Sequence, residues 1–114
     1  MRKRIETIKG SNQREILMDI TFPEKSNDKL VVFSHGFKGF KDWGCFDLIA
    51  QNFAQNGFTF LKFNFSHNGT KVYDPLNFTD LEAFGNNNFS KELNDLGFVL
   101  DWVENNLYPI QHKT

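Results

Sequence analysis

The sequence lacks the features of a secreted, membrane-spanning or metal-binding protein. Its single cysteine, Cys45, excludes an internal disulfide framework and a multi-cysteine metal site. No apolar run approaches the roughly 20 residues that span a bilayer. The basic trio Arg2-Lys3-Arg4 is followed by polar residues where a signal peptide would have its apolar core. We therefore expect a cytoplasmic protein that binds no membrane.

An excess of charge of one sign is also missing. The formal net charge is −1 at pH 7, and the lysines and arginines are spread along the chain, which excludes the basic patch of a nucleic-acid-binding protein. The histidines His35, His67 and His112 stand far apart, without the spacing of metal ligands. No glycine-rich phosphate-binding motif occurs. We expect no nucleic-acid partner, no metal and no cofactor.

A nucleophile elbow is absent as well. Such an elbow needs the pattern Gly-x-Ser-x-Gly on a sharp turn between a strand and a helix. None of the five serines has a glycine two residues away on both sides. Cys45 lies in Trp43-Gly44-Cys45-Phe46-Asp47, which does not fit the pattern either, and we expect it to be semi-buried at a helix start. The sequence therefore contains no credible catalytic serine.

Phenylalanine, in contrast, is abundant. Fourteen phenylalanines supply large flat rings, each of which can bury about 150–250 Å², so we expect an aromatic core. Two short strands are predicted first, over residues 4–9 and over Glu15–Phe22, the second interrupted by Asp19. The cluster Gly10-Ser11-Asn12-Gln13 between them predicts a hairpin turn.

A pattern of buried strands around a helix follows. The continuous run Leu30-Val31-Val32-Phe33 predicts a strand covered on both faces. Apolar residues then recur at helical spacing from Phe46 to Ala54, and Gly57 stands where a glycine ends a helix. Residues 58–65 predict another apolar strand. These two strands should be parallel and joined by a right-handed crossover through the helix.

The last third of the chain predicts a polar loop and then a long helix. The loop carries Asp74, Asp80 and Glu82, which we expect to be solvated, and Asp95 and Asp101 are assigned to the polar face of the helix. Together the elements predict an α/β protein, whose mixed sheet is covered by helices on both faces. The apolar stripe of the helix consists of Phe89, Leu93, Leu96, Leu100, Val103 and Leu107.

The strand exit Phe33-Ser34-His35-Gly36-Phe37 gives the strongest indication of a family. A buried strand that ends in His-Gly, followed by a loop and a helix, resembles the α/β-hydrolase superfamily of serine esterases, dienelactone hydrolases and acyl-peptidases. The resemblance implies that the backbone amide of Phe37 donates to the oxyanion of a tetrahedral intermediate. It also implies that Gly36 lets the backbone turn closely beneath the substrate, and that His35 shapes the loop rather than acting as a base.

The same resemblance implies a partial α/β-hydrolase sheet, with an antiparallel hairpin at one edge and the fourth strand between the second and the third. Residues 1–114 then form a single incomplete domain with strands one to four and the first two helices, without the nucleophile elbow and the later elements. The strand Leu30-Val31-Val32-Phe33 becomes an open edge without charge or proline. We expect self-association, aggregation or binding of a complementing fragment through this edge.

Four side chains are candidates for the substrate pocket. Phe40 and Trp43 either line an acyl pocket or cover the edge of the sheet. Ser66 and His67 follow the last predicted strand, at a carboxyl end where open α/β sheets place their sites, and we assign them to the pocket wall. We do not expect them to form a Ser–His pair, because successive side chains of an extended segment point in opposite directions.

These observations predict the N-terminal part of an α/β-hydrolase that acts by acyl transfer on a small-molecule ester or amide. The chain would supply the oxyanion loop and part of the pocket, and it would be inactive alone. Three alternatives remain open. The chain is a non-catalytic module that binds a small acyl ligand, a subunit of a split hydrolase, or a fragment without a function of its own.

Overall fold

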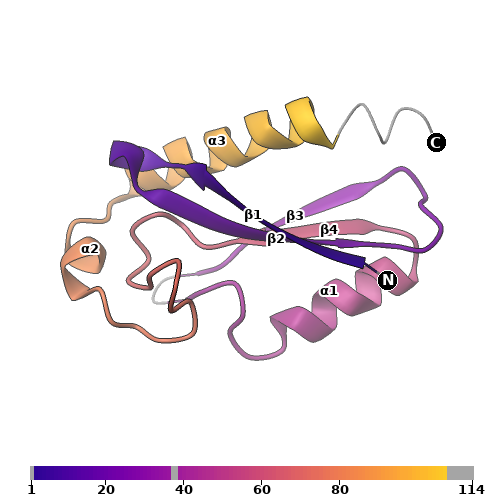
Figure 1. The fold of residues 1–114 in the computed structure, drawn as a ribbon, viewed down its shortest axis with the longest axis horizontal. Coiled ribbons are helices and arrows are strands. Elements are labelled where there is room, and N and C mark those ends of the chain that lie inside the picture. Colours follow the sequence, from indigo (N-terminus) through magenta and orange to yellow (C-terminus); the bar gives the residue numbers. More distant parts are fainter. Residues whose placement is uncertain (1, 37–38, 108–114) are drawn as a thin grey trace.

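A four-stranded mixed sheet forms the centre of the protein (Figure 1). The computed structural model describes residues 2–36 and 39–107. The strand order is β1-β2-β4-β3, with β1 (Arg2–Lys9), β2 (Glu15–Phe22), β3 (Leu30–Ser34) and β4 (Thr59–Phe63). β2 pairs antiparallel with both β1 and β4, whereas β3 and β4 are parallel. The predicted α/β class, the hairpin edge, the parallel pair and the place of the fourth strand are confirmed.

Helices α1 (Phe46–Gln55) and α3 (Phe89–Asn106) cover opposite faces of the sheet (Figure 1). Because side chains alternate along a strand, each face has its own composition. The face toward α1 carries the ring of Phe60, which stacks on Phe53 of the helix at 5.3 Å, and the buried charges of Asp19 and Lys62. The face toward α3 forms the apolar core, which includes Ile16, Met18, Ile20, Leu61, Phe63, Val99, Val103 and Leu107.

Helix α1 ends where the sequence predicts, just before Gly57. Gly57 has a φ of +92°, a left-handed conformation that glycine adopts without steric cost. Its N–H donates to the carbonyl of Ala54 at 3.0 Å, and the N–H of Phe58 donates to the carbonyl of Phe53 at 3.1 Å, which is the Schellman arrangement. The rings of Phe53 and Phe58 meet edge to face at 5.5 Å. The helix end and the entry into β4 are therefore fixed together.

Helix α3 forms where predicted, but the predicted stripe is only partly buried. Phe89, Leu93 and Leu100 are 73%, 53% and 47% exposed, and we call these three residues the open flank of α3. Trp102 is on the side of the helix that faces β1, where the guanidinium of Arg4 lies over its ring at 5.5 Å. At 3.6 residues per turn, the open flank lies on the side of the helix opposite Trp102.

The stretch predicted as a polar loop contains an additional short helix, α2 (Leu81–Gly85). Asp80 begins it as an N-cap, because its carboxylate accepts a hydrogen bond from the N–H of Ala83 at 3.1 Å. The prediction missed this helix because five residues are too few to show an apolar period. None of the helices within the described ranges is long and apolar enough to cross a membrane.

Candidate functional site

The exits of β3 and β4 lie side by side, because the two strands are parallel and Ser34 is in register with Phe63. Two segments leave the sheet at this edge. Residues 35–45 lead from β3 to α1, and residues 64–70 lead from β4 toward α2. In open α/β sheets, ligands bind at the carboxyl ends of the strands. Most of the residues that the sequence singles out lie on these two segments.

The imidazole of His35 is buried between the two segments. Its Nε2 accepts a hydrogen bond from the backbone N–H of Phe65 at 3.2 Å. The proton therefore sits on Nδ1, which lies 2.9 Å from the carbonyl oxygen of Gly36 and donates to it. Burial lowers the pKa of His35, and the bond to Gly36 opposes this shift only in part. With both nitrogens engaged, a neutral His35 fixes the backbone around it.

The loop that follows His35 closes on itself. The N–H of Gly39 donates to the carbonyl of Gly36 at 2.9 Å. A side chain at position 39 would place its Cβ 2.8 Å from that same carbonyl oxygen, so the turn requires glycine there. Phe37, the predicted oxyanion donor, lies outside the described residues.

Phe40 and Trp43 are the aromatic candidates for the pocket. Phe40 is half-buried and Trp43 is 57% exposed. The indole of Trp43 lies 5.8 Å from the ring of Phe46, which in turn lies 4.5 Å from the ring of Phe33 on β3. These rings form a row beside β3 on the face of the sheet that α1 covers.

Ser66 and His67 do form a pair, so the expectation that they cannot is wrong. The Oγ of Ser66 lies 2.8 Å from Nδ1 of His67, and both residues are buried. The segment is a turn, closed by the N–H of Asn68 donating to the carbonyl of Phe65 at 3.1 Å. In a turn, adjacent side chains can meet, unlike in an extended strand. Burial, together with the charges of Lys91 and Arg14, lowers the pKa of His67.

A cleft of about 410 Å³ opens between the β1–β2 turn and the segment after β4. Of the four predicted pocket residues, Ser66 lines this cleft. Phe40, Trp43 and His67 are not part of its wall. The polar residues around it include Lys9, Arg14, Glu15, Asn64, Asn68 and Lys71.

Arg14 and Asp80 hold one wall of this cleft. The guanidinium of Arg14 donates to the carbonyl of Ser66 at 2.5 Å and to that of Thr70 at 3.3 Å, and it pairs with the carboxylate of Asp80. The N–H of Ala83 and the guanidinium of Arg14 lower the pKa of Asp80. Asp80 is therefore not the solvated loop residue that the sequence suggests.

Asp95 is the second acidic residue whose prediction is wrong. Its exposed fraction is 0%, although the sequence assigns it to the polar face of α3. Its Oδ1 accepts hydrogen bonds from the N–H and the Oγ of Ser11, each at 2.8 Å. Its Oδ2 accepts from the N–H of Ser66 at 2.7 Å. One carboxylate thus joins α3, the β1–β2 turn and the exit of β4.

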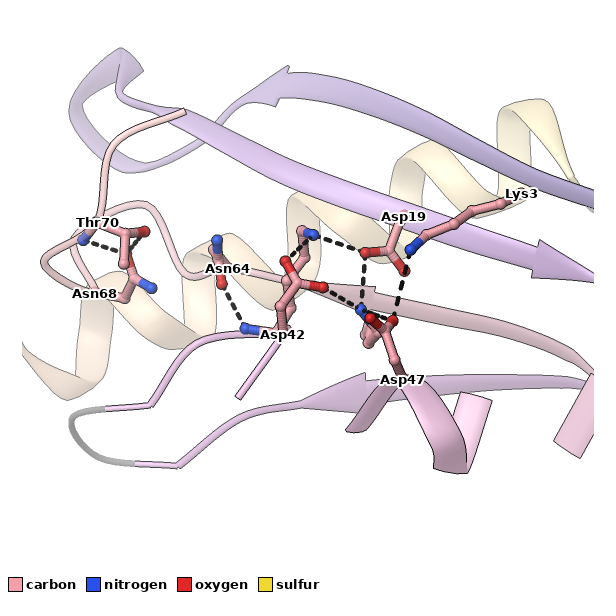
Figure 2. A network of polar contacts seen from close by, with 9 residues as sticks. Lys3, Asp19, Asp42, Asp47, Asn64, Asn68 and Thr70 are labelled. Atoms are coloured by element: carbon pink, nitrogen blue, oxygen red, sulfur yellow. Dashed lines mark hydrogen bonds and ion pairs between the residues drawn. The ribbon is translucent and has the colours of Figure 1, made fainter. Parts of the chain in front are cut away.

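A buried ion network, which the sequence did not lead us to predict, lies between β2, β4 and the start of α1 (Figure 2). Asp19 of β2 and Lys62 of β4 are cross-strand neighbours on the same face of the sheet. Nζ of Lys62 lies 2.9 Å from Oδ2 of Asp19, and neither side chain is exposed. Lys41 reaches the same Oδ2 at 2.7 Å. Each lysine also contacts Asp42 at 2.6 Å. The network as a whole is balanced in charge and consists of Lys3, Lys41, Lys62, Asp19, Asp42 and Asp47.

The network stabilises the charged forms of Asp42, Asp47 and Lys62. Burial acts to raise the pKa of Asp42, but hydrogen bonds from Lys41 and Lys62 outweigh it and the pKa is lowered. Asp47 follows the same pattern, with Lys62 as its main partner. For Lys62, burial acts to lower the pKa, but the hydrogen bonds that its ammonium group donates to Asp42, Asp47 and Asp19 outweigh burial and raise the pKa overall.

The remaining candidates for chemistry are a metal site and Cys45. Within residues 2–36 and 39–107, no three His, Cys, Asp or Glu side chains gather in a way that could hold a metal ion. Cys45 is exposed at the N-cap of α1. The expectation that it would be semi-buried is wrong, since residues 43–45 are all exposed.

Solved structures share this fold, although the sequence matches no protein-family model and no curated protein. A cold-adapted esterase from an Arctic intertidal metagenomic library has a TM-score of 0.72 at 18% identity, over 94% of this chain and 46% of that one. An α/β serine hydrolase homologue from Coxiella burnetii has 0.65 at 20% identity, over 92% and 47%. Brefeldin A esterase, a bacterial homologue of human hormone-sensitive lipase, has 0.66 at 18% identity, over 91% and 27%.

The chain therefore spans less than half the length of each of these three structures. Likeness at these identities establishes the fold. The four strands, with helices on both faces and an unclosed sheet, have the arrangement of one part of an α/β-hydrolase domain. The resemblance seen at the exit of the third strand is confirmed at the level of architecture.

Proposed function

We propose that this chain supplies the N-terminal part of an acyl-transfer site that acts on small-molecule esters or amides. The observation that carries the proposal is the place of the His-Gly loop. In a sheet of α/β-hydrolase order, the loop begins at the carboxyl end of β3, and His35 holds it against the exit of β4. A backbone N–H placed there can stabilise the negative oxygen of a tetrahedral intermediate.

Each residue of the proposed site has one role. The amide of Phe37 is the oxyanion donor, Gly36 lets the backbone approach the substrate, and His35 shapes the loop. Around them, we assign the pocket wall to the exit of β4 and to the row of rings beside β3. Ser66 lines the cleft of about 410 Å³, whereas His67, Phe40 and Trp43 lie outside it. The cytoplasmic location expected from the sequence is part of the same proposal.

The nucleophile is the missing component, so we expect the chain to be inactive alone. The Ser66–His67 pair has the atoms of a nucleophile and a base, yet the N–H of Ser66 is bound to Asp95 and its carbonyl to Arg14. These bonds fix Ser66 as part of the scaffold. With p-nitrophenyl acetate, the purified chain should hydrolyse no faster than buffer. Turnover that disappears in Ser66→Ala, His35→Ala or Cys45→Ala would contradict the proposal.

The free edge of β3 is the place where a partner strand fits. The chain passes from β3 to β4 through α1 on one face, and it leaves β4 for α3 on the opposite face. Parallel crossovers are right-handed, so a strand reached through α3 would lie on the far side of β3. The open flank of α3 and the uncharged edge of β3 are the surfaces that such a strand and its helix would cover.

We predict that this edge makes the isolated chain self-associate. Five of the eight residues of β1 are charged, which blunts that edge, whereas β3 has no charged residue. Size-exclusion chromatography with light scattering should therefore show a mass that rises with concentration. Val31→Lys on β3 should shift the chain toward monomer, and Ile5→Lys on β1 should not. A stable monomer at all concentrations would count against a binding edge.

The cleft lined by Ser66 favours a second candidate function, a non-catalytic module that binds a small ligand. Its volume of about 410 Å³ lies within the usual range for small-molecule sites. A ligand that raises the melting temperature without being hydrolysed would support this function.

A subunit of a split hydrolase differs in its behaviour, because mixing the chain with a fragment that carries the nucleophile elbow should restore esterase activity.

A further inference from the structure

Two sets of contacts hold the loop after β3, one on each side of Phe37. On the N-terminal side, His35 bonds to Gly36 and to the exit of β4. On the C-terminal side, the carbonyl of Gly39 accepts a hydrogen bond from the side-chain amide of Asn68 at 3.3 Å. The first set is part of the motif that the sequence shows. The second depends on residues outside that motif.

Lys41 is central to the second set, and Figure 2 labels its partners Asn64, Asp19 and Asp42. Its backbone N–H donates to Oδ1 of Asn64 at 2.6 Å, which ties it to the exit of β4. Its ammonium group reaches down to Asp19 of β2 at 2.7 Å, and Lys41 is only 4% exposed. Both ends of one residue are therefore attached to the sheet. The next residue, Asp42, is attached to Lys62 of β4 at 2.6 Å.

Ion pairs of this kind can hold the part of the loop that leads from Gly39 to α1. The segment between Gly39 and α1 contains no regular helix or strand, so main-chain ladders cannot hold it. Hydrogen bonds between charged groups are about twice as strong as neutral ones. Because the site is buried, water competes poorly for the same groups.

We propose that Lys41 and Asp19 are positioning residues for the oxyanion loop. The pair fixes the return of the loop, from Gly39 to Asp42, against β2 before a substrate binds. This inference rests on the proposed function for its purpose, and it deepens that function by naming the residues that fix the C-terminal part of the loop. Neither residue needs to touch the substrate.

Hydrogen exchange of backbone amides, measured by NMR on the full chain, tests the proposal. In Lys41→Met, the exchange rates of the amides of Gly39 and Lys41 should rise about 10- to 100-fold, as expected when a charged hydrogen bond is lost. The amide of Val99 in the core should speed up only as much as the loss of global stability in urea dictates. Lys29→Met, an exposed lysine just before β3, is the matched control and should change neither rate.

Two further variants keep the result interpretable. Asp42→Asn alters a more accessible member of the network and should speed up exchange in the same loop amides by a smaller factor. In Lys41→Cys combined with Cys45→Ser, alkylation of the new thiol with 2-bromoethylamine restores an ammonium group at position 41. This alkylation should return the loop amides toward their original rates, which a mere repacking of the core would not do.

The proposal is overturned if the loop amides keep their original rates, or if they and Val99 accelerate by the same factor. The same holds if Lys41→Met does not fold and Asp42→Asn leaves the loop unchanged. Because exchange reports loop order rather than catalysis, it separates this inference from the proposed function. A complemented enzyme that hydrolyses no ester would refute acyl transfer and leave the positioning intact.

Discussion

Replacing Lys62 with methionine is expected to lower the free energy of unfolding by about 3–5 kcal/mol, the usual result of removing one partner from a buried ion pair. The side chain of Lys62 is fully buried and contacts Asp19, Asp42 and Asp47. Without its ammonium group, the interior carries one uncompensated negative charge. Urea denaturation of the wild type and Lys62→Met measures the difference directly.

The double variant Asp19→Leu/Lys62→Met should recover most of that loss. The two residues are direct cross-strand neighbours, and the remaining Lys41–Asp42 and Lys3–Asp47 pairs stay balanced in charge. In addition, Oδ1 of Asp19 is buried without a hydrogen-bond partner among the described residues, so the ionic arrangement carries a cost that leucine removes. Additive losses in the double variant would show that the pair is not coupled.

The free energy of unfolding should depend on the same ion network when the pH is lowered. The lowered pKa values of Asp42 and Asp47 mean that their contribution is complete above the unfolded value of about 3.9 and is lost as the pH falls through their folded values. The raised pKa of Lys62 places its own loss at the alkaline end, above about 10.4. Without Lys62, stability should therefore change less between pH 5 and acid than it does in the wild type.

Local patterns predicted the backbone well, because they report local constraints. The bounds of β2 agree with the predicted Glu15–Phe22, and Gly57 marks the end of α1 because only a residue tolerant of positive φ continues the chain there. The order of the strands came from the resemblance. It could not come from periodicity, because a period indicates which side chains share a face and leaves the neighbouring strand open.

The polar contacts could not be predicted from the sequence either, because they depend on which strands and segments are neighbours. Asp19 and Lys62 stand alone in two apolar strands, and their opposite charges were the available signal, yet their pairing depends on β4 lying next to β2. Asp95 looks solvated on a helical wheel because its partners Ser11 and Ser66 are 84 and 29 residues away in the sequence. His67 meets Ser66 only because the strand ends before them.

The exposed residues of α3 show a similar limit of the sequence patterns. Helical spacing correctly found an apolar stripe, but it could not show how much of this stripe the present sheet covers. Val99 and Val103 face the core, whereas Phe89, Leu93 and Leu100 do not. The helix is thus apolar over a wider arc than four strands can bury, and the excess lies on the side opposite Trp102, away from β1.

The second large effect is expected for Asp95→Ala, which should lower the free energy of unfolding by about 3–5 kcal/mol. The change leaves the buried N–H groups of Ser11 and Ser66 without acceptors, and each such group costs about 1–3 kcal/mol. Loss of the bond from the Oγ of Ser11 adds to this. Asp101→Ala, on the exposed side of the same helix, is the matched control and should stay within about 0.5 kcal/mol of the wild type.

Asp95→Ala should also change the local structure around Ser66 and His67. Asp95 is the acceptor that holds the N–H of Ser66, while Arg14 holds its carbonyl. In Asp95→Asn, one oxygen can still accept from Ser11, but the amide nitrogen cannot accept from Ser66, so an intermediate loss is expected. NMR signals of Ser66 and His67 should move in both variants and stay in place in Asp101→Ala. If Asp95→Ala is as stable as Asp101→Ala, the carboxylate does not join α3 to the exit of β4.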